Sequence, residues 1–270
     1  MLCDAVASKA GLRAGMRVTA ARALLPTVHV VERDAAAEQA AMVRLACWAG
    51  EFTPRVSLVP AESNNGCHAL LLDIGACLRL FDGIDVLMHR IAMGLHEQGM
   101  TAQVAVAPIA QAALWLAAEA PARMCSDLDE MHDLMRHLPL DVLPPQAAEV
   151  LGDFGMRTLG DVRLLPEAAL ARRIDAEALL LLLRGFGEIP DPRPLFDFPE
   201  RFSMSLELPA AVESVEMLLF AAHRLVAALA GWLAVRQAGV RELALHLLHR
   251  RDATVVSLHF AEATRDKLRI

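Results

Sequence analysis

The sequence contains no tyrosine and few aromatic residues of any kind. Aromatic side chains make up 4% of the 270 residues, whereas hydrophobic residues make up 55% and charged residues 22%. This hydrophobic content excludes a disordered chain, and the cores must be built mainly from alanine, leucine and valine. The length suits two or three small domains.

Basic residues are in the minority. Lysine and arginine together number 26 against 33 aspartate and glutamate residues, which gives a net charge of −7, and no lysine occurs between Lys9 and Lys267. This balance does not suit a protein that grips nucleic acid by bulk electrostatics alone, although it leaves room for a local basic face.

Signals for metal binding, common catalytic motifs and export are missing as well. The five cysteines are scattered, and no two have the C-x₂₋₄-C spacing of a structural zinc site. The first residues lack the charged-then-apolar order of a signal peptide, and neither a G-x-G-x-x-G loop nor a nucleophile elbow occurs. We therefore expect a cytoplasmic protein with no metal ion or cofactor.

One apolar stretch, residues 217–235, approaches the length of a membrane span. It contains His223 and Arg224, and an arginine near the centre of a span costs ~2.5–3.5 kcal/mol on insertion scales. We expect a buried amphipathic helix, with a membrane helix as the alternative.

The first half of the sequence predicts helices around a small sheet. Two short strands, 55–59 and 68–74, flank a turn-like segment and form a plausible hairpin. A further strand is predicted at 101–107, and helices are predicted at 4–9, 19–25, 35–49, 85–98 and 109–120. This order favours an α+β layer whose sheet is covered by helices on one face.

The second half predicts short helices followed by a second α/β segment. Proline and glycine interrupt the helices beyond residue 126, and the proline-rich segment 189–194 predicts a linker. Apolar and polar residues alternate over 202–208, which predicts a strand. A long helix at 212–236 and strands at 240–248 and 255–260 follow.

A helical hairpin is predicted around Gly155, with Thr158 starting its second helix. In a helix-hairpin-helix motif, such a glycine lets backbone N–H groups approach a DNA phosphate. An ordinary αα-hairpin uses the same glycines, so both interpretations stay open. The segment 126–188 carries twelve acidic residues against six arginines, which argues against a tight phosphate clamp.

Several motifs occur in an order and spacing that are together fairly specific. They are Gly11-Leu12-Arg13-Ala14-Gly15-Met16, Ala20-Ala21-Arg22-Ala23-Leu24-Leu25-Pro26, Leu72-Asp73-Ile74, Arg79-Leu80-Phe81-Asp82-Gly83 and Thr101-Ala102-Gln103-Val104-Ala105-Val106-Ala107. With the hairpin at Gly155 they resemble the Y-family (UmuC-like) translesion DNA polymerases over nearly the whole chain. The ImuB branch of that family is similar in Leu138-Pro139-Leu140, Gly155-Met156-Arg157-Thr158-Leu159-Gly160-Asp161-Val162, Leu165-Pro166 and Leu170-Ala171-Arg172-Arg173.

The resemblance implies a multidomain α+β fold of polymerase type. Residues 1–34 would be partial fingers and 35–123 a palm without its first strand, followed by a helical thumb with a helix-hairpin-helix at 124–188. Residues 189–198 would be a linker, and 199–270 an incomplete α/β little finger. On this template the sequence is truncated at both ends, as a natural fragment or a mis-started reading frame.

The sequence departs from the family at the expected catalytic site. Polymerases of this family hold two metal ions on three carboxylates, two of them adjacent in a Ser-x-Asp-Glu-x-x-Leu-Asp run. Counted back from Leu72-Asp73, that adjacent pair falls on His68 and Ala69, which cannot bridge two Mg²⁺ ions because Mg²⁺ prefers oxygen ligands. Asp73 matches a structural acid of the strand, and the third metal carboxylate belongs to a strand upstream of Met1.

The nucleotide-binding positions of the family are altered in the same way. The Tyr-x-x-Arg that binds the triphosphate falls on Ala5 and Ser8, a lysine falls near Leu114, and an Asn-Lys pair falls near Ile109-Ala110. The resemblance together with these departures implies a catalytically inactive polymerase homologue.

We therefore expect a DNA-repair accessory protein of translesion synthesis and the SOS response. It would bind damaged primer–template DNA and repair proteins without polymerising and without a membrane. The protein partners that the family implies are a sliding clamp, a partner polymerase and a RecA-like accessory protein. Two alternatives stay open: an active translesion polymerase whose catalytic residues are misaligned, and a helix-hairpin-helix DNA-binding module with no role at a replication fork.

Predicted DNA contacts lie in two places. The first is the hairpin, with Gly155, Arg157 and Thr158. The second is the segment 199–270, whose net charge is +1 and which carries Arg241, Arg250 and Arg251 on or beside its predicted strands. In the family fold these strands would face the duplex; the alternative is that the arginines only make an exposed sheet soluble.

Overall fold

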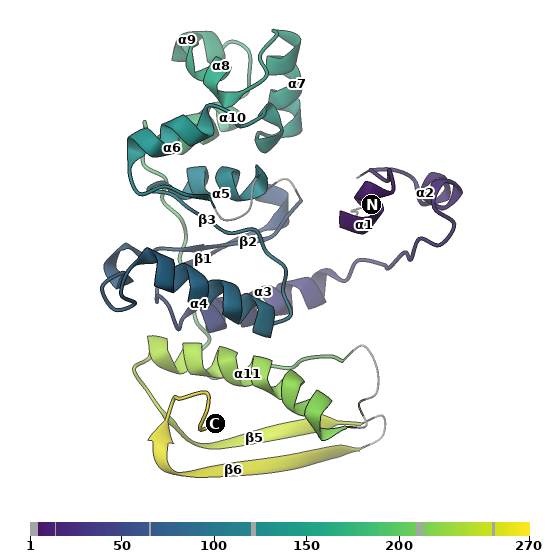
Figure 1. The fold of residues 1–270 in the computed structure, drawn as a ribbon, viewed down its shortest axis with the longest axis vertical. Coiled ribbons are helices and arrows are strands. Elements are labelled where there is room, and N and C mark those ends of the chain that lie inside the picture. The colour runs from purple at the N-terminus through teal and green to yellow at the C-terminus, as the bar shows by residue number, and fades with distance from the viewer. Residues whose placement is uncertain are drawn as a thin grey trace. The chain divides into compact units, whose positions relative to one another are not determined.

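The computed structural model of the chain describes residues 5–13, 15–64, 66–119, 123–208, 212, 214–249 and 252–270. The chain divides into two compact units, Met1–Ala41 and Met42–Ile270, and both are drawn in Figure 1. The boundary predicted between residues 34 and 35 falls within the first of these units.

The first unit is a small helical body. It contains α1 (Ala5–Lys9) and α2 (Val18–Leu24), and Leu12 and Ala21 are buried in it. Both helices were predicted with bounds one residue away from those observed. A third helix, α3 (Ala35–Ala49), begins in this unit and continues into the second.

The predicted hairpin is confirmed at the start of the second unit. β1 (Val56–Val59) and β2 (Ala69–Leu72) pair antiparallel, with Val59 opposite Ala69. The connection contains the 3₁₀ turn η1 (Ala61–Ser63). Both strands are shorter than predicted, because only four residues of each strand pair with the other.

Aromatic side chains are concentrated where the hairpin meets its helices. Trp48 at the end of α3 contacts Phe52 edge-to-face with ring centroids 5.1 Å apart, and Phe52 lies 5.9 Å from Phe81. The helix α4 (Ile84–Glu97), which follows the 3₁₀ turn η2 (Gly75–Cys77), packs beside α3. Few aromatics therefore suffice, because these rings share one core with alanines and leucines.

The strand predicted at 101–107 is much shorter in the structure. β3 spans only Ala105–Val106 and pairs in parallel with β4 (Arg123–Met124), a strand that the sequence pattern did not predict. β4 has two residues, and β3 can form strand hydrogen bonds only along the length of this neighbour. The helix predicted at 109–120 is confirmed as α5 (Ala110–Glu119), and it connects these two strands.

A helical segment follows, built on α5. Its elements are α6 (Leu128–Met135), η3 (Leu140–Val142), α7 (Pro145–Asp153), α8 (Leu159–Arg163), α9 (Glu167–Leu170) and α10 (Ala176–Phe186). One core joins all of them to α5, with Trp115 of α5 lying 6.4 Å from Phe186 of α10. The predicted alternation of short helices with proline and glycine is confirmed.

The proline-rich linker has no regular structure, yet it is held along its length. The Asp191 carboxylate accepts a hydrogen bond from the N–H of Gln111 at 2.9 Å, and Asp191 also forms an ion pair with Arg193 at 2.9 Å. Further along, the N–H of Phe196 donates to the carbonyl of Val56 in β1 at 2.7 Å. The linker is therefore fixed to the surface of the second unit.

The prediction of a strand at 202–208 is wrong. Side chains alternate between half-buried and exposed as predicted, but this segment forms no ladder with any strand in the part of the chain that the structure describes. Instead Phe202 and Met204 pack into the core of α3 and α4, and the Phe202 ring lies 5.9 Å from that of Trp232. The alternation of apolar and polar residues therefore reflects one face packed on the helix core, and no neighbouring strand is needed to explain it.

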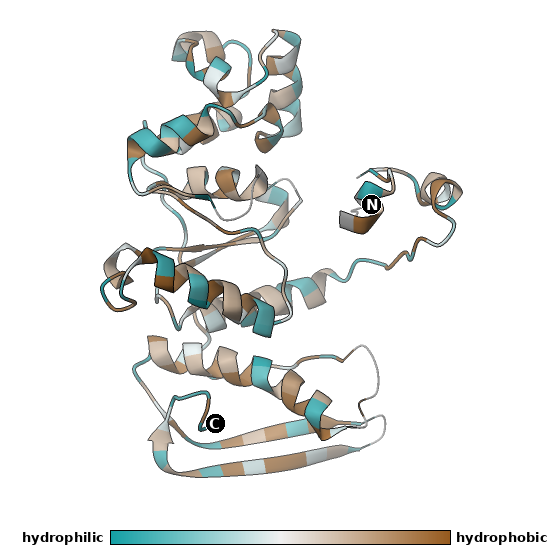
Figure 2. Cartoon of the chain, in the orientation of Figure 1, coloured by the Kyte–Doolittle hydropathy of each residue, from teal (hydrophilic) through white to brown (hydrophobic). Residues whose placement is uncertain are grey.

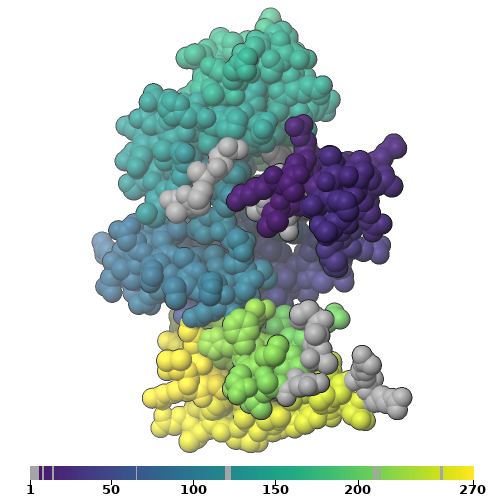
Figure 3. Space-filling model, turned by 45° about the vertical axis from the view of Figure 1, so that its right-hand side comes forward, coloured from purple at the N-terminus to yellow at the C-terminus, as the bar shows by residue number. Residues whose placement is uncertain are grey.

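The chain ends in a C-terminal module of one helix and two strands. α11 (Val215–Val235) leads to β5 (Val240–Leu248) and β6 (Ala253–Thr264), which pair antiparallel. The helix and β5 agree with the predictions, while β6 is longer than the strand predicted at 255–260. In Figure 1, α11 lies between the helices α3 and α4 on one side and the two strands on the other, and in Figure 3 the green atoms of this part of the chain lie between blue and yellow ones.

The position of α11 explains part of its composition. By length and hydropathy it could cross a membrane. However, Ala227 and Ala228 are buried in the core with α3 and α4, and brown apolar residues occur around the helix in Figure 2. The buried residues lie mainly in the second half of the helix, whereas Met217, Leu219 and Phe220 in its first half are exposed, so burial accounts for only part of its apolar composition.

Candidate functional site

His68 and Ala69 stand at the start of β2. Ala69 is the first residue of the strand and lies opposite Val59 of β1, while His68 precedes it and is half-buried. Neither side chain offers a carboxylate oxygen. The hairpin therefore presents an imidazole and a methyl group at the place where the polymerase resemblance requires two adjacent acids.

Asp73, directly after β2, helps to close the hairpin. Its carboxylate accepts a hydrogen bond from Nε of Arg55 at 2.8 Å, and its carbonyl accepts one from the Thr53 hydroxyl at 2.7 Å. The side chains of Arg55 and Asp73 are 60% and 58% exposed, so this ion pair contributes at most about 1 kcal/mol. Asp73 acts as a structural acid in this arrangement.

The described ranges contain no group of three or more His, Cys, Asp or Glu side chains placed to hold a metal ion. Two Mg²⁺ ions in a polymerase site need several oxygen ligands close together. The imidazole and the methyl group at the expected position do not fit such a pair of ions.

The positions expected to bind a triphosphate differ in accessibility. Leu114 lies in α5 and is 7% exposed, so its side chain faces the interior. Ile109 precedes the same helix, and its side chain lies against Gly187. Ala5 and Ser8 belong to α1, but their side chains lie outside the described part of the structure.

Gly155 forms the end of α7 and has a φ of +84°. A Cβ at this position would meet no atom within 4 Å, so the backbone angle, rather than space, requires glycine. The N–H of Gly155 donates to the carbonyl of Gly152 at 2.9 Å, and that of Met156 donates to Leu151 at 3.2 Å. These two bonds are the Schellman pattern of a helix end.

Asp161 closes the other side of the hairpin. Its carboxylate accepts hydrogen bonds from the N–H groups of Arg157 at 2.9 Å and Thr158 at 3.0 Å, while the Thr158 hydroxyl accepts one from the N–H of Asp161. These backbone donors hold the pKa of Asp161 below its usual value. The result is a capping box at the start of α8.

Every backbone N–H from residue 155 to 161 therefore has an acceptor within the chain, because Leu159 and Gly160 donate to the carbonyls of Leu138 and Arg136. A phosphate at this hairpin would have to displace the Asp161 carboxylate. The backbone N–H groups of Gly155 and Thr158, which were predicted to contact DNA, are thus already hydrogen-bonded within the chain. This geometry favours an ordinary αα-hairpin.

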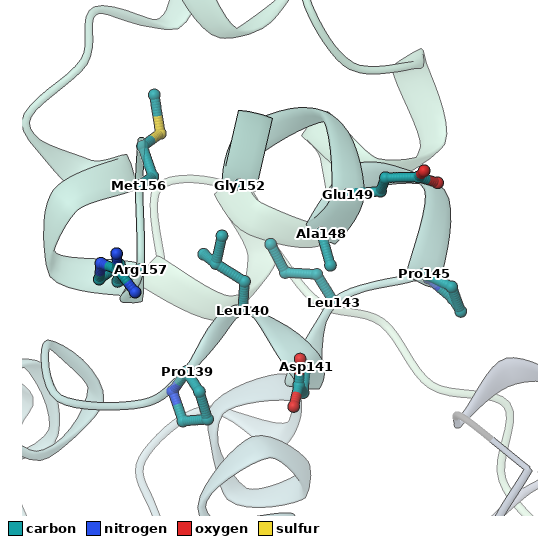
Figure 4. A pocket seen from close by; sticks show the side chains of 10 residues that line it. All are labelled: Pro139, Leu140, Asp141, Leu143, Pro145, Ala148, Glu149, Gly152, Met156 and Arg157. Carbon is teal, nitrogen blue, oxygen red and sulfur yellow. The ribbon is translucent and has the colours of Figure 1, made fainter. Parts of the chain in front are cut away.

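The side chain of Arg157 is exposed and lines an open groove beside the hairpin, shown in Figure 4. The groove has a volume of about 620 Å³ and an apolar floor that includes Leu140, Leu143 and Met156. Two carboxylates, Asp141 and Glu149, line it together with Arg157. The groove therefore carries both positive and negative side chains, and this mixture does not favour binding of the negatively charged backbone of a nucleic acid.

Of the three arginines predicted in the C-terminal module, Arg241 can be placed. It lies in β5 and is exposed, and it makes no ion pair with any described residue. The neighbouring Glu242 faces His259 of β6 at 4.0 Å. Arg250 and Arg251 lie outside the described residues, between the two strands.

Sequence reasoning missed one group of charged residues. Between residues 5 and 31 the chain has four basic residues and no acidic one. All four are exposed in the structure: Lys9, Arg13, Arg17 and Arg22. The signal was present in the sequence as a local departure from the acidic average.

The comparisons with known proteins agree with the fold. Residues 1–118 match the model of the family described as impB/mucB/samB. Protein ImuB of Caulobacter vibrioides (strain NA1000 / CB15N) is 31% identical over 179 residues, which is 66% of this chain and 38% of that protein. The chain thus spans well under half of the length of this relative.

Solved structures extend the similarity over nearly the whole chain. A DinB family error-prone DNA polymerase from Sulfolobus solfataricus is 18% identical and has a TM-score of 0.56, covering 97% of this chain and 78% of its own. An insertion ternary complex of Dbh DNA polymerase is 18% identical with a TM-score of 0.55, covering 97% and 76%. The chain therefore has the fold of the Y-family DNA polymerases, and its first 118 residues are similar to the impB/mucB/samB family.

Proposed function

We propose that this chain is a non-polymerising relative of the Y-family polymerases that binds DNA and repair proteins during the response to DNA damage in the cytoplasm. The observation that carries the proposal is the pair His68 and Ala69 at the start of β2, where the family's adjacent metal carboxylates are expected. The similarity to Protein ImuB supports a role in DNA damage, and the polymerase fold supports binding of DNA.

One further feature supports the absence of catalysis. Leu114 is buried where the family has a lysine for the triphosphate. A site that holds neither the metal ions nor the triphosphate lacks the electrostatic stabilisation on which phosphoryl transfer depends.

Primer extension tests the proposal directly. The full chain is incubated with a labelled primer–template, the four dNTPs and either Mg²⁺ or Mn²⁺, beside an active Y-family polymerase as the assay control. We expect no dNTP-dependent product. A product that depends on dNTPs and disappears in His68→Ala would establish the alternative, an active polymerase with misaligned catalytic residues.

A double substitution separates metal binding from nucleotide binding. His68→Asp combined with Ala69→Glu restores carboxylates at the hairpin but leaves Leu114 unchanged. We expect this variant to remain inactive, because the triphosphate is still not held. Extension by the double variant would mean that nucleotide binding is intact and that only the metal ligands are missing.

Binding of DNA is the positive part of the function. We propose that Arg241, with Arg250 and Arg251, contributes contacts from the C-terminal module, and that Arg157 is the candidate contact of the hairpin. Protein partners of the kind that the resemblance implies, a sliding clamp, a partner polymerase and a RecA-like accessory protein, are part of the same proposal. Absence of primer–template binding by the folded full chain, measured by fluorescence anisotropy, would refute it.

A further inference from the structure

The first unit contains a segment whose charge is opposite to that of the rest of the chain. Residues 5–31 carry four basic side chains and no acidic one, while the remaining residues carry eleven more acidic than basic side chains. Such a separation orients the molecule in an electric field, and a polyanion would approach the basic segment first.

The four cations of this segment are exposed and unpaired. Lys9 ends α1, Arg13 lies in the connection, Arg17 precedes α2, and Arg22 lies in its last turn. None of them forms an ion pair or a side-chain hydrogen bond with any described residue. Their charges are therefore available to a ligand outside the chain.

The acidic residues that follow this segment are already engaged at the start of α3. Glu38 accepts hydrogen bonds from Arg33, the closest at 2.7 Å, and Asp34 accepts one from the N–H of Ala37 at 2.9 Å. Both carboxylates thus serve the start of that helix. They do not neutralise the cations of α1 and α2.

The local backbone is also open to a close approach. Gly11 and Gly15 flank Arg13, and a Cβ on either would meet no described atom within 4 Å. Leu12 is buried at 3% exposure and fixes this connection to the unit. Arg13 is therefore presented on an anchored loop in which the two glycines place no side chain in the way.

We propose that residues 5–31 form a nucleic-acid-binding surface that contacts the phosphate backbone through Lys9, Arg13, Arg17 and Arg22. This inference rests on the proposed function and locates its DNA contacts in the first unit, in addition to Arg241 in the C-terminal module. Phosphodiesters suit the surface because it offers several separate positive charges at exposed positions, as a repeating polyanion requires.

The number of phosphate contacts can be measured from the salt dependence of DNA binding. Each phosphate that the protein no longer neutralises flattens the slope of log affinity against log salt concentration by about 0.9 for duplex DNA. Replacing all four cations by glutamine should therefore flatten the slope by about 3 to 4. Single substitutions Arg17→Gln and Arg22→Gln should each flatten it by about 1.

The experiment uses the full chain and a fluorescein-labelled primer–template duplex, titrated from low to moderate salt. The quadruple variant Lys9→Gln, Arg13→Gln, Arg17→Gln, Arg22→Gln is compared with a control of equal charge change, Arg79→Gln, Arg136→Gln, Arg172→Gln, Arg201→Gln, whose residues are also exposed. We expect the slope of the first variant to be flatter by about 3 to 4 and the slope of the control to be unchanged. Circular dichroism spectra check that both variants are folded.

The outcomes separate this inference from the proposed function. Normal salt dependence in the first variant, with DNA binding by the wild-type chain, would overturn the inference and leave the function in place. Equal flattening in both variants would also overturn it, since the effect would then be one of net charge. No binding of DNA by the wild-type chain would overturn both.

Discussion

Gly231 in α11 offers a stringent test of how the C-terminal module is joined to the rest of the second unit. A Cβ on Gly231 would lie 2.6 Å from the carbonyl oxygen of Trp48, and closer still to that of Cys47. On the facing side, a Cβ on Gly50 would lie 2.8 Å from the carbonyl oxygen of Gly231. The two helices thus approach backbone to backbone, and backbone atoms cannot move aside as a side chain can.

The change Gly231→Ala adds one methyl group at this contact. Overpacking of this kind costs about 1–3 kcal/mol, and the better helix propensity of alanine offsets about 1 kcal/mol of it. We expect the free energy of unfolding to fall by up to about 2 kcal/mol. The measurement is urea denaturation of the full chain, followed by tryptophan fluorescence and circular dichroism.

Gly152 in α7 provides the matched control. It is exposed, and a Cβ there would meet no atom within 4 Å. Gly152→Ala should therefore raise the free energy of unfolding by about 0.5–1 kcal/mol, because only helix propensity changes. If both substitutions stabilise the chain, the close approach of α11 to α3 is refuted.

Three further predictions concern single side chains. Backbone donors lower the pKa of Asp161 in the folded chain. The ionised carboxylate therefore contributes stability above the pKa of an unfolded aspartate, about 3.9, and this stability is lost as the pH falls through the pKa of the folded chain. Asp161→Asn should remove this part of the dependence of stability on pH, as measured by denaturation at several pH values. Burial raises the pKa of Cys47 to about 11, so in the native chain near pH 8 iodoacetamide should modify the exposed Cys67 and leave Cys47 unmodified until unfolding, as read by peptide mass spectrometry. Asp191→Ala removes the ion-pair partner of Arg193 and should lower the free energy of unfolding by about 1–3 kcal/mol. The same change should speed cleavage of the linker by trypsin. Unchanged cleavage would show that the linker is held by its other contacts.

Local sequence signals accounted for most of the elements. The β1–β2 hairpin, α3 and β5 were predictable because their periodicity and flanking turn residues lie within the segments themselves. The Thr158-x-x-Asp161 spacing is also a visible signal for a capping box, which accounts for the Asp161 carboxylate at the hairpin. A capping box alone is compatible with both interpretations of the hairpin, and only the full set of backbone hydrogen bonds distinguishes them.

Non-local partners explain what could not be predicted from the sequence. Residues 202–208 alternate like a strand, but the alternation reports one buried face and does not say whether that face meets a strand or a helix core. The pairing of β3 with β4, and the approach of Gly231 to Gly50, join residues far apart in the chain and leave no periodic mark. At the candidate site, the identity of His68 and Ala69 was readable, whereas the burial of Leu114 required the fold.

The linker between the helical segment and the C-terminal module has a thermodynamic consequence. It is bound to the second unit at Gln111 and again at Val56, so the ordering of its backbone is complete when the chain folds. Ordering a residue costs about 1–2 kcal/mol of conformational entropy, and a loose tether would lose that entropy each time two modules closed on a ligand. The linker residues that hold these contacts therefore add no such ordering cost to a later binding step.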